Sequence, residues 1–334
     1  MNWIDAAKGL TMILVVTKHT TYGVAAATGH VPYLFNYLCE LTIPFRMPLF
    51  FLVAGLFAER AIRGSFRDFA DKKLLHFAYF YVLWSLIQIG IKMALPHEGV
   101  WNVGMKDLLL IPVEPFGLMW FIYALAVFFI VMRLLRDVSK PVVYGFALIL
   151  YFTQLDTGWT MPDEFARRFI FFVSGVYGAP YMFQLASWAQ AHVRAGLLAG
   201  LALIAAVGGV VFTGLVDIRA FELAVGYAGA VGTILLVALL AARGLARPLS
   251  YVGERSLYVF LAFFLPMAAT RIVALKLGVE NGDLITLAAV IMAVGTPLIG
   301  YDLLKKTPLS FVFVRPDMFR LKPHGRTPEA AIPA

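Results

Sequence analysis

Runs of apolar residues, each close to the length of a membrane-spanning helix, recur along the whole chain. A helix needs about 20 residues to cross the hydrocarbon core of a bilayer. The candidate runs are 4–25, 42–58, 74–94, 116–135, 141–154, 165–182, 196–214, 221–242, 256–275 and 284–303. The run over 141–154 is short and contains Pro141 and Gly145. The pattern predicts an all-α protein, a polytopic membrane helix bundle with about ten transmembrane helices.

The basic residues between these runs predict how the bundle is oriented. Most of the 28 Lys and Arg residues fall in every second turn and in the C-terminal segment. Loops rich in Lys and Arg remain on the cytoplasmic side of membrane proteins. We therefore expect both termini to be cytoplasmic, with a transmembrane domain over residues 1–304 and a basic cytoplasmic tail over residues 305–334.

Composition supports a membrane protein and argues against several other classes. The chain has 334 residues, of which 61% are hydrophobic and 14% charged, and its mean hydropathy is +0.81. A soluble domain contains about 25% charged residues. The net charge of +8 is explained by cytoplasmic loops, without nucleic acid. The sequence contains no HExxH, CxxC, P-loop or Gly-x-Ser-x-Gly motif, so we expect no metal.

The first apolar run carries ionisable residues on one face of the helix that it predicts. The eleven steps from Lys8 to His19 turn a helix by about 1100°, within about 20° of three full circles, and Asp5 lies about 40° from His19. Ionisable groups inside a membrane normally face protein or water and mark functional sites. Lys18 lies about 100° around the helix from His19. It either reaches the same water and keeps the imidazole neutral, or snorkels outward.

The second apolar run places Arg46 at a depth that matches His19. Pro44 and Pro48 flank Arg46 and free backbone carbonyls, which a membrane tolerates where they line a cavity. A neutral histidine and an arginine at one depth suit base catalysis with stabilisation of a developing oxyanion. The alternative is an arginine that snorkels to the headgroups and a histidine that bonds to a neighbouring carbonyl.

Further candidates lie near the outer face. Glu114 precedes the fourth run and would orient His19 or balance its charge, and Glu40 offers the same chemistry. Trp120 lies at the start of that run, and Arg168 lies near the start of the sixth. Glu114 and Glu40 are equally well explained as carboxylates that simply face solvent.

A basic group lies at the inner end of the third run. Lys72, Lys73 and His76 open this run, and together with Lys8 they would attract the phosphates of a cytosolic cofactor. Positive charge facing anionic lipid explains each lysine equally well.

Two motifs resemble one family of membrane enzymes. Residues 4–9 (Ile-Asp-Ala-Ala-Lys-Gly) with the apolar run ending in His19, and residues 45–55 (Phe-Arg-Met-Pro-Leu-Phe-Phe-Leu-Val-Ala-Gly), resemble the acyltransferase-3 family. The closest pattern is that of its fucose 4-O-acetylase-like subgroup. Weaker similarities lie at residues 118–121 (Leu-Met-Trp-Phe) and 253–260 (Gly-Glu-Arg-Ser-Leu-Tyr-Val-Phe).

The family's functional residues map onto this chain with some departures. Its Arg-x10-His pair corresponds to Lys8 and His19, and its Arg-x-x-Arg becomes Lys73-x-x-His76. Arg46 stands where a histidine is common, and Ala54 stands where the family has serine.

The resemblance implies a membrane-bound, acetyl-CoA-dependent O-acyltransferase. It would move an acyl group, usually acetyl, from cytosolic acyl-CoA to a hydroxyl of a cell-envelope glycan or glycolipid. Acyl-CoA would be the co-substrate, membrane lipid the surroundings, and the bacterial inner (plasma) membrane the location; a homo-oligomer is compatible with this picture. The expected catalytic residues are His19 as base or acyl relay, Arg46 for the oxyanion, and Glu114. The expected donor-binding residues are Asp5, Lys8, Lys72, Lys73 and His76, and the expected acceptor-side residues are Trp120 and Arg168.

A secondary transporter or flippase for a sugar or lipid-linked sugar is the alternative. The ionisable stripe would then carry protons or substrate. Transporters often contain internal repeats with broken helices at corresponding positions, and this sequence shows no repeat. Covalent acylation of a product distinguishes the two functions.

Overall fold

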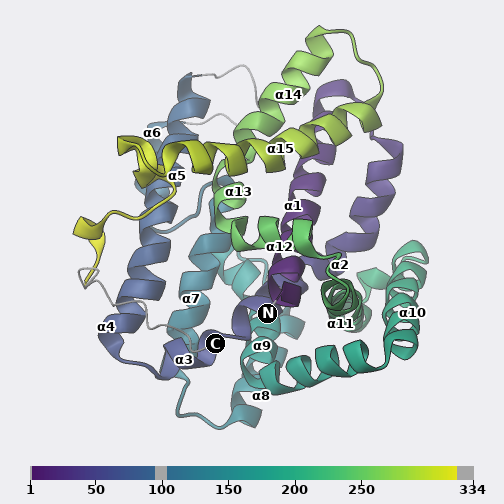
Figure 1. Cartoon of the computed structure of the whole chain (residues 1–334). Helices are drawn as coiled ribbons and strands as arrows, with labels where there is room; N and C mark the ends of the chain where they lie inside the picture. The colour runs from purple at the N-terminus through teal and green to yellow at the C-terminus, as the bar shows by residue number, and fades with distance from the viewer. Residues whose placement is uncertain (1, 95–103, 322–334) are drawn as a thin grey trace, which may run out of the picture. The chain divides into compact units, whose positions relative to one another are not determined.

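A computed structural model describes residues 2–94 and 104–321. Every regular element within these ranges is a helix, which confirms the predicted all-helical fold (Figure 1). The chain divides into two compact units that each combine separate stretches of sequence. The first unit comprises Met1–Phe57, Lys140–Thr153 and Arg168–Leu303, and the second comprises Ala58–Ser139, Gln154–Arg167 and Leu304–Ala334.

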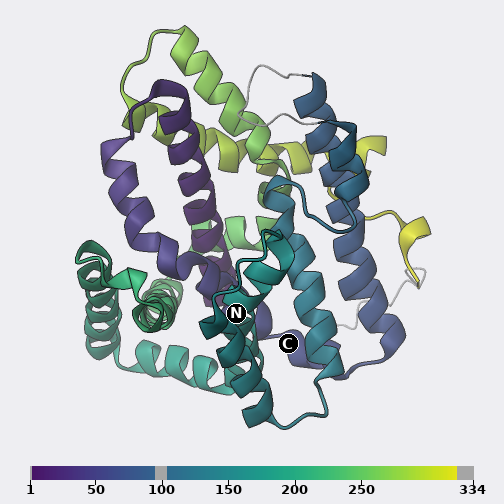
Figure 2. The ribbon, with the colours of Figure 1, turned by 180° about the vertical axis from the view of Figure 1, so that it is seen from behind.

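The first unit contains most of the long helices. They are α1 (Asn2–Thr28), α2 (Tyr33–Gly55), α8 (Lys140–Thr153), most of α9 (Thr160–Ala191), α10 (Val193–Phe212), the short η4 (Leu215–Asp217), α11 (Arg219–Ala242), α12 (Arg247–Glu254), α13 (Ser256–Ala262), α14 (Phe264–Lys276) and α15 (Gly282–Leu304). In both views α1 and α2 run side by side, as do α10 and α11 (Figures 1 and 2).

The second unit is smaller and contains two long helices, α5 and α7, that pack against each other. Its elements are α3 (Ala58–Arg63), α4 (Phe66–Phe69), the π-helical η1 (Ala70–Leu75), α5 (His76–Ala94), α6 (Met105–Leu110), η3 (Gly117–Met119), α7 (Trp120–Leu134), η5 (Pro308–Val312) and η6 (Asp317–Phe319). The α4–η1–α5 series forms one continuous apolar stretch over Phe66–Ala94.

Helix α1 crosses α12 at backbone contact in the first unit. A β-carbon on Gly9 would lie 1.9 Å from the Leu249 carbonyl oxygen, and one on Gly253 would lie 1.6 Å from the Asp5 carbonyl oxygen. Both distances are far below van der Waals contact, so neither position has room for a side chain. Small residues allow helices in membranes to approach this closely, and the crossing fixes the position of α1.

The threonines of α1 satisfy their hydrogen bonds within the helix. Thr11, Thr17, Thr20 and Thr21 each donate at 2.8 Å to the carbonyl oxygen four residues earlier. All four side chains are buried. A buried hydroxyl without a partner destabilises the fold, so this back-bonding lets a polar helix lie inside the bundle.

Helix α2 is held equally closely by its neighbours in the first unit. A β-carbon on Gly175 of α9 would lie 2.1 Å from the Leu52 carbonyl oxygen, and one on Gly229 of α11 would lie 2.2 Å from Cγ of Phe45. Phe45 directly precedes Arg46, so the contact with Gly229 fixes the turn of α2 that carries this arginine.

Seven helices in the described residues are long and apolar enough to cross a membrane. They are Tyr33–Gly55, Phe66–Ala94, Gly117–Leu134, Thr160–Ala191, Val193–Phe212, Arg219–Ala242 and Gly282–Leu304. Helices α13 and α14 together are long and apolar enough to add one more span. That span is broken, because the two helices meet at a bend of 54°.

The predicted number of about ten spans is not confirmed. Helix α8 has 14 residues and is short for a span. Helix α1 has 27 residues, but Lys18, His19 and its threonines lower its hydropathy. The orientation with both termini in the cytoplasm and the domain boundary at residue 304 stay predictions. Part of the predicted tail packs in the second unit, where Phe313 is buried.

We expect Gly253→Ala to destabilise the protein, because the added methyl group would push α1 away from α12. Overpacking of this kind costs about 3 kcal/mol. The midpoint of thermal unfolding in detergent measures the effect. Gly209→Ala in α10 is the matched control, since a β-carbon there has no atom within 4 Å. Equal midpoints for the two variants would contradict the close α1–α12 contact.

Candidate active site

The ionisable stripe of α1 is present, but its members differ in their partners. Lys8 pairs with Asp5 at 3.0 Å, and the two side chains are 33% and 28% exposed. Their charges therefore compensate each other at one end of the helix. His19 lies further along α1 and belongs to a different set of contacts.

His19 is half-buried beside the break between α13 and α14. Its ring lies 6.0 Å from the ring of Phe263, the residue at which the two helices bend. The charges of Lys18 and Arg46 act on the imidazole. Neither ring nitrogen has a hydrogen-bond partner within the described residues. The imidazole is therefore available to a substrate proton.

Arg46 is buried in the interior of α2 between Pro44 and Pro48. Its residue is 8% exposed, and its Nη1 has no hydrogen-bond partner among the described residues. A buried guanidinium normally carries a carboxylate partner, because an unpaired buried charge costs free energy. The charge of Arg46 is one of those that act on His19, and the predicted joint role of the two residues stays a prediction. The buried donor is suited to an oxygen that becomes negative during a reaction.

Arg168, which the sequence predicts on the acceptor side, lies within the first unit with polar residues that sequence reasoning missed: Tyr151, Arg219 and Glu222. Arg168 acts on both Arg46 and Tyr151 through its charge. Arg219 at the start of α11 pairs with Glu222, and its guanidinium lies 4.9 Å from the centre of the Tyr151 ring. These residues come from α2, α8, α9 and α11, and no spacing in the sequence relates them.

Glu114 in the second unit hydrogen-bonds to the start of α9. Its carboxylate accepts from the Thr160 backbone N–H at 3.1 and 3.2 Å and from the Thr160 hydroxyl. A carboxylate at a helix N-terminus is stabilised by the unpaired N–H groups there. A role for Glu114 beside His19 stays a prediction. Trp120 begins α7 and packs edge-on against Phe121, 6.2 Å between ring centres.

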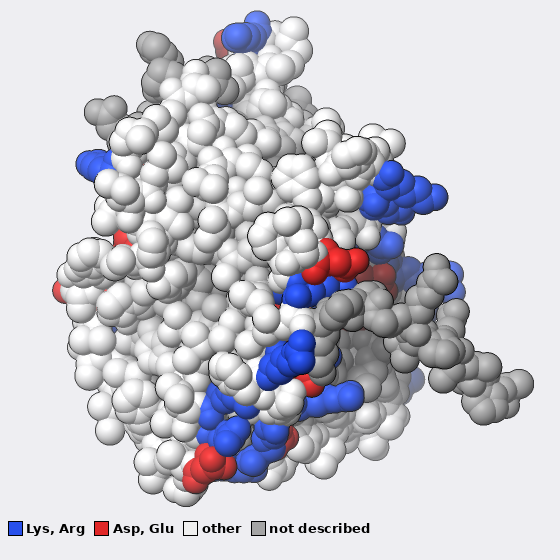
Figure 3. Space-filling model, turned by 90° about the vertical axis from the view of Figure 1, so that its left-hand side faces the viewer, with Lys and Arg blue, Asp and Glu red and all other residues white. Residues whose placement is uncertain are grey.

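The predicted donor-binding residues of the second unit lie in and after the π-helical turn η1. The Lys73 ammonium lies 4.4 Å above the Phe129 ring, and the His76 ring packs 5.1 Å from Phe80. Lys72 is exposed. Figure 3 shows Lys and Arg side chains gathered low in the view, at the level where Figure 1 places α3 and α4.

Two basic residues that the sequence did not assign join this group. The charges of Arg315 and Arg320 act on His76 together with those of Lys73 and Asp71. Both arginines lie more than two hundred positions later in the chain, so only the fold brings them here. Among the described residues no group of three or more His, Cys, Asp or Glu side chains is arranged to hold a metal ion.

These features define a helical membrane protein with an imidazole and a buried guanidinium inside its helix bundle. The acyltransferase-3 family model, described as an acyltransferase domain, matches residues 1–301. The chain therefore belongs to the acyltransferase-3 family and is a membrane acyltransferase. Among curated proteins and among solved structures, no significant match is found.

We expect Arg46→Met to leave the protein as stable as the wild type or to stabilise it, although it removes a buried charge. An unpaired buried guanidinium is costly, and an apolar side chain of similar length removes that cost. Thermal unfolding in detergent measures the change. A large drop in the unfolding midpoint would mean that Arg46 has a structural partner and would contradict its assignment as an available donor.

Proposed function

We propose that this acyltransferase moves an acyl group, by preference acetyl, from cytosolic acyl-CoA to a hydroxyl of a cell-envelope glycan or glycolipid. Its location would be the bacterial inner (plasma) membrane, and its pattern would place it in the fucose 4-O-acetylase-like subgroup. The proposal rests on the imidazole of His19, on which the charge of Arg46 acts, and on the buried Nη1 of Arg46. Neither group has a hydrogen-bond partner within the described residues. Membership of an acyltransferase family supports the reaction class.

In the proposed reaction, His19 is the general base. One ring nitrogen takes the proton of the acceptor hydroxyl while the hydroxyl oxygen attacks the thioester carbonyl. The carbonyl oxygen becomes an oxyanion, and the Arg46 guanidinium donates hydrogen bonds to it. When the intermediate collapses, the carbon–sulfur bond breaks, the acyl group stays on the acceptor oxygen, and the sulfur leaves as CoA thiolate. The proton held by His19 then goes to that sulfur.

A second route would pass through a covalent intermediate, in which His19 itself carries the acyl group. His19 would attack the thioester, release CoA and hold the acyl group until the acceptor hydroxyl takes it. A covalently labelled protein after incubation with labelled acyl-CoA alone would identify this route, whereas direct transfer leaves the protein unlabelled.

The remaining proposed roles are assigned within each unit. In the first unit, Arg168, Tyr151 and the Arg219–Glu222 pair offer hydrogen-bond donors and acceptors to the sugar of the acceptor. The Lys8–Asp5 pair of that unit is a candidate for binding the donor. In the second unit, the donor phosphates would lie near Lys72, Lys73 and His76, and Trp120 stays a predicted acceptor-side residue.

We expect His19→Ala to reduce acyl transfer by about 10² to 10⁴-fold, the usual loss when a general base is removed. Purified protein in nanodiscs would be given radiolabelled acetyl-CoA and a mixed glycan extract, and free CoA and labelled glycan would be measured. His30→Ala is the control, because His30 is exposed and lies outside the site.

Transfer that survives in well-folded His19→Ala protein would keep the enzyme but reject this mechanism. No CoA release by the folded wild type with any acceptor would favour the transporter or flippase, since a transporter leaves its substrate chemically unchanged.

A further inference from the structure

The C-terminal segment over residues 308–321 lies against the α4–η1–α5 stretch of the second unit. Two side chains of α5 hold its backbone: Tyr79 donates to the Phe311 carbonyl oxygen at 2.9 Å, and Trp84 donates to the Val312 carbonyl oxygen at 2.8 Å. Side-chain donors that hold successive backbone carbonyls fix the path of a segment. The segment starts after residue 301, where the family match ends.

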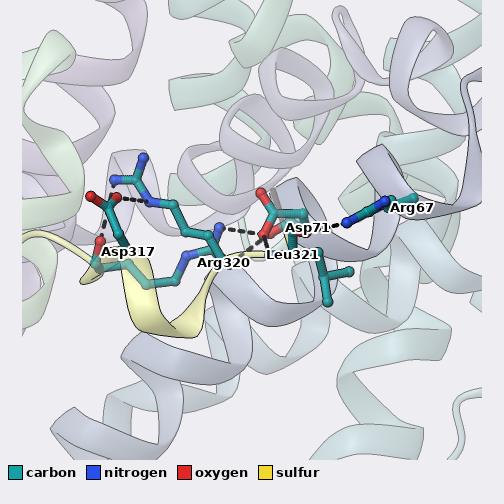
Figure 4. Close-up of polar contacts among 6 residues, drawn as sticks. Arg67, Asp71, Asp317, Arg320 and Leu321 are labelled. Carbon is teal, nitrogen blue, oxygen red and sulfur yellow. Dashed lines mark hydrogen bonds and ion pairs between the residues drawn. The ribbon is translucent and has the colours of Figure 1, made fainter. Parts of the chain in front are cut away.

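Asp71 is the centre of a second set of contacts (Figure 4). Arg315 donates to its carboxylate Oδ1 at 2.8 Å and to its backbone carbonyl oxygen at 2.7 Å. The backbone N–H of Leu321 donates to the same Oδ1 at 2.8 Å, and Arg67 donates to the Leu321 carbonyl oxygen at 2.6 Å. The side chains of Arg315 and Asp71 are 6% and 14% exposed, so this ion pair is shielded from solvent.

These contacts hold a turn that is unusual in its own right. Asp71 lies in η1, a π-helical turn over Ala70–Leu75. Such turns are rare and occur frequently at functional sites. Because Arg315 bonds to both the main chain and the side chain of Asp71, it fixes the turn that directs Lys73 and the first residue of α5, His76.

The same contacts bring positive charge to His76. Arg315, Lys73 and Arg320 are basic and Asp71 is acidic, so the groups whose charges act on the His76 ring carry a net positive charge. Arg320 is itself held by Asp317 at 3.2 Å and by the Arg315 carbonyl oxygen at 3.2 Å. Nε of Arg315 is buried and has no hydrogen-bond partner within the described residues. A cluster of this kind suits an anion such as phosphate.

We propose that Arg315, through its contacts with Asp71, positions the π-helical turn so that Lys73 and His76 bind the phosphate groups of the acyl donor. The inference rests on the proposed use of acyl-CoA. If the inference holds, the C-terminal segment contributes to the donor site, although it lies beyond the residues that match the family. The replacement of the family's Arg-x-x-Arg by Lys73-x-x-His76 is then offset by arginines that arrive from the end of the chain.

The test compares Arg315→Gln, Arg315→Lys and Lys306→Gln in the full-length chain. Lys306 is exposed and lies just before the same segment. Its replacement by Gln removes one positive charge, as Arg315→Gln does. We expect Arg315→Gln to raise KM for acetyl-CoA and the inhibition constant of pyrophosphate by about 10-fold, with kcat nearly unchanged. The reason is that a released turn would misplace Lys73 and cost about one charge-assisted hydrogen bond to phosphate. Arg315→Lys should recover part of the loss, and Lys306→Gln should match the wild type.

Hydrogen exchange on the wild type gives a test that does not depend on any variant folding. Pyrophosphate should slow exchange in residues 70–76 and 311–321 together. Protection in neither segment would overturn the inference, as would a folded Arg315→Gln protein with unchanged KM or with a loss in kcat alone. Pyrophosphate protection in a wild type that transfers no acyl group would keep the anion site and reject the proposed function.

Discussion

The contact between the backbones of α1 and α12 is the constraint on which the first unit depends. Gly9 and Gly253 leave no space for a β-carbon, so each helix sets the position of the other. α1 also contacts α2 and α11, and close contacts at Gly175 and Gly229 hold α2 against α9 and α11. Backbones packed this tightly allow little variation in depth or rotation. The depth and rotation of His19 and Arg46 are therefore set by the packing of the helices that carry them.

The same unit shows how most polar groups are accommodated in an apolar bundle, and Arg46 differs in having no carboxylate partner among the described residues. The threonines of α1 bond within their own helix, Lys8 has Asp5, and Arg219 has Glu222. The buried Nη1 of Arg46 has no hydrogen-bond partner in the part of the chain that the structure describes. A protein retains such a cost where function requires it. Catalysis by a preformed donor needs this arrangement, since a donor that is already satisfied cannot stabilise a new charge.

The sequence predicted the features that depend on local pattern. Apolar runs predicted the long helices, and the motifs around His19 and Arg46 predicted the family that the match over residues 1–301 confirms. The equal depth of His19 and Arg46 in two helices that contact each other stays a prediction, although the charge of Arg46 does act on His19. The predicted number of about ten spans is not confirmed, because α8 is short and α13 bends into α14 at Phe263, which length and hydropathy alone do not reveal.

Features that depend on distant parts of the chain were outside the reach of sequence reasoning. The division into two units separates residues that are neighbours in sequence. Arg315 reaches Asp71 across 244 positions, and nothing near either residue indicates the contact. The sequence therefore predicts only a basic cytoplasmic tail over residues 305–334. In the same way, Arg219 and Tyr151 belong to a polar group that only packing assembles.

The crossing of α1 and α12 also has a consequence for how the protein is made. α1 is not among the seven helices of the described residues that are long and apolar enough to cross a membrane. Its principal partner, Arg247–Glu254, is synthesised about 240 residues later, a delay of about 10–50 s at ordinary rates of translation. During that interval α1 lacks the surface that covers Gly9. Its assembly is therefore completed late, by a segment from the last third of the chain.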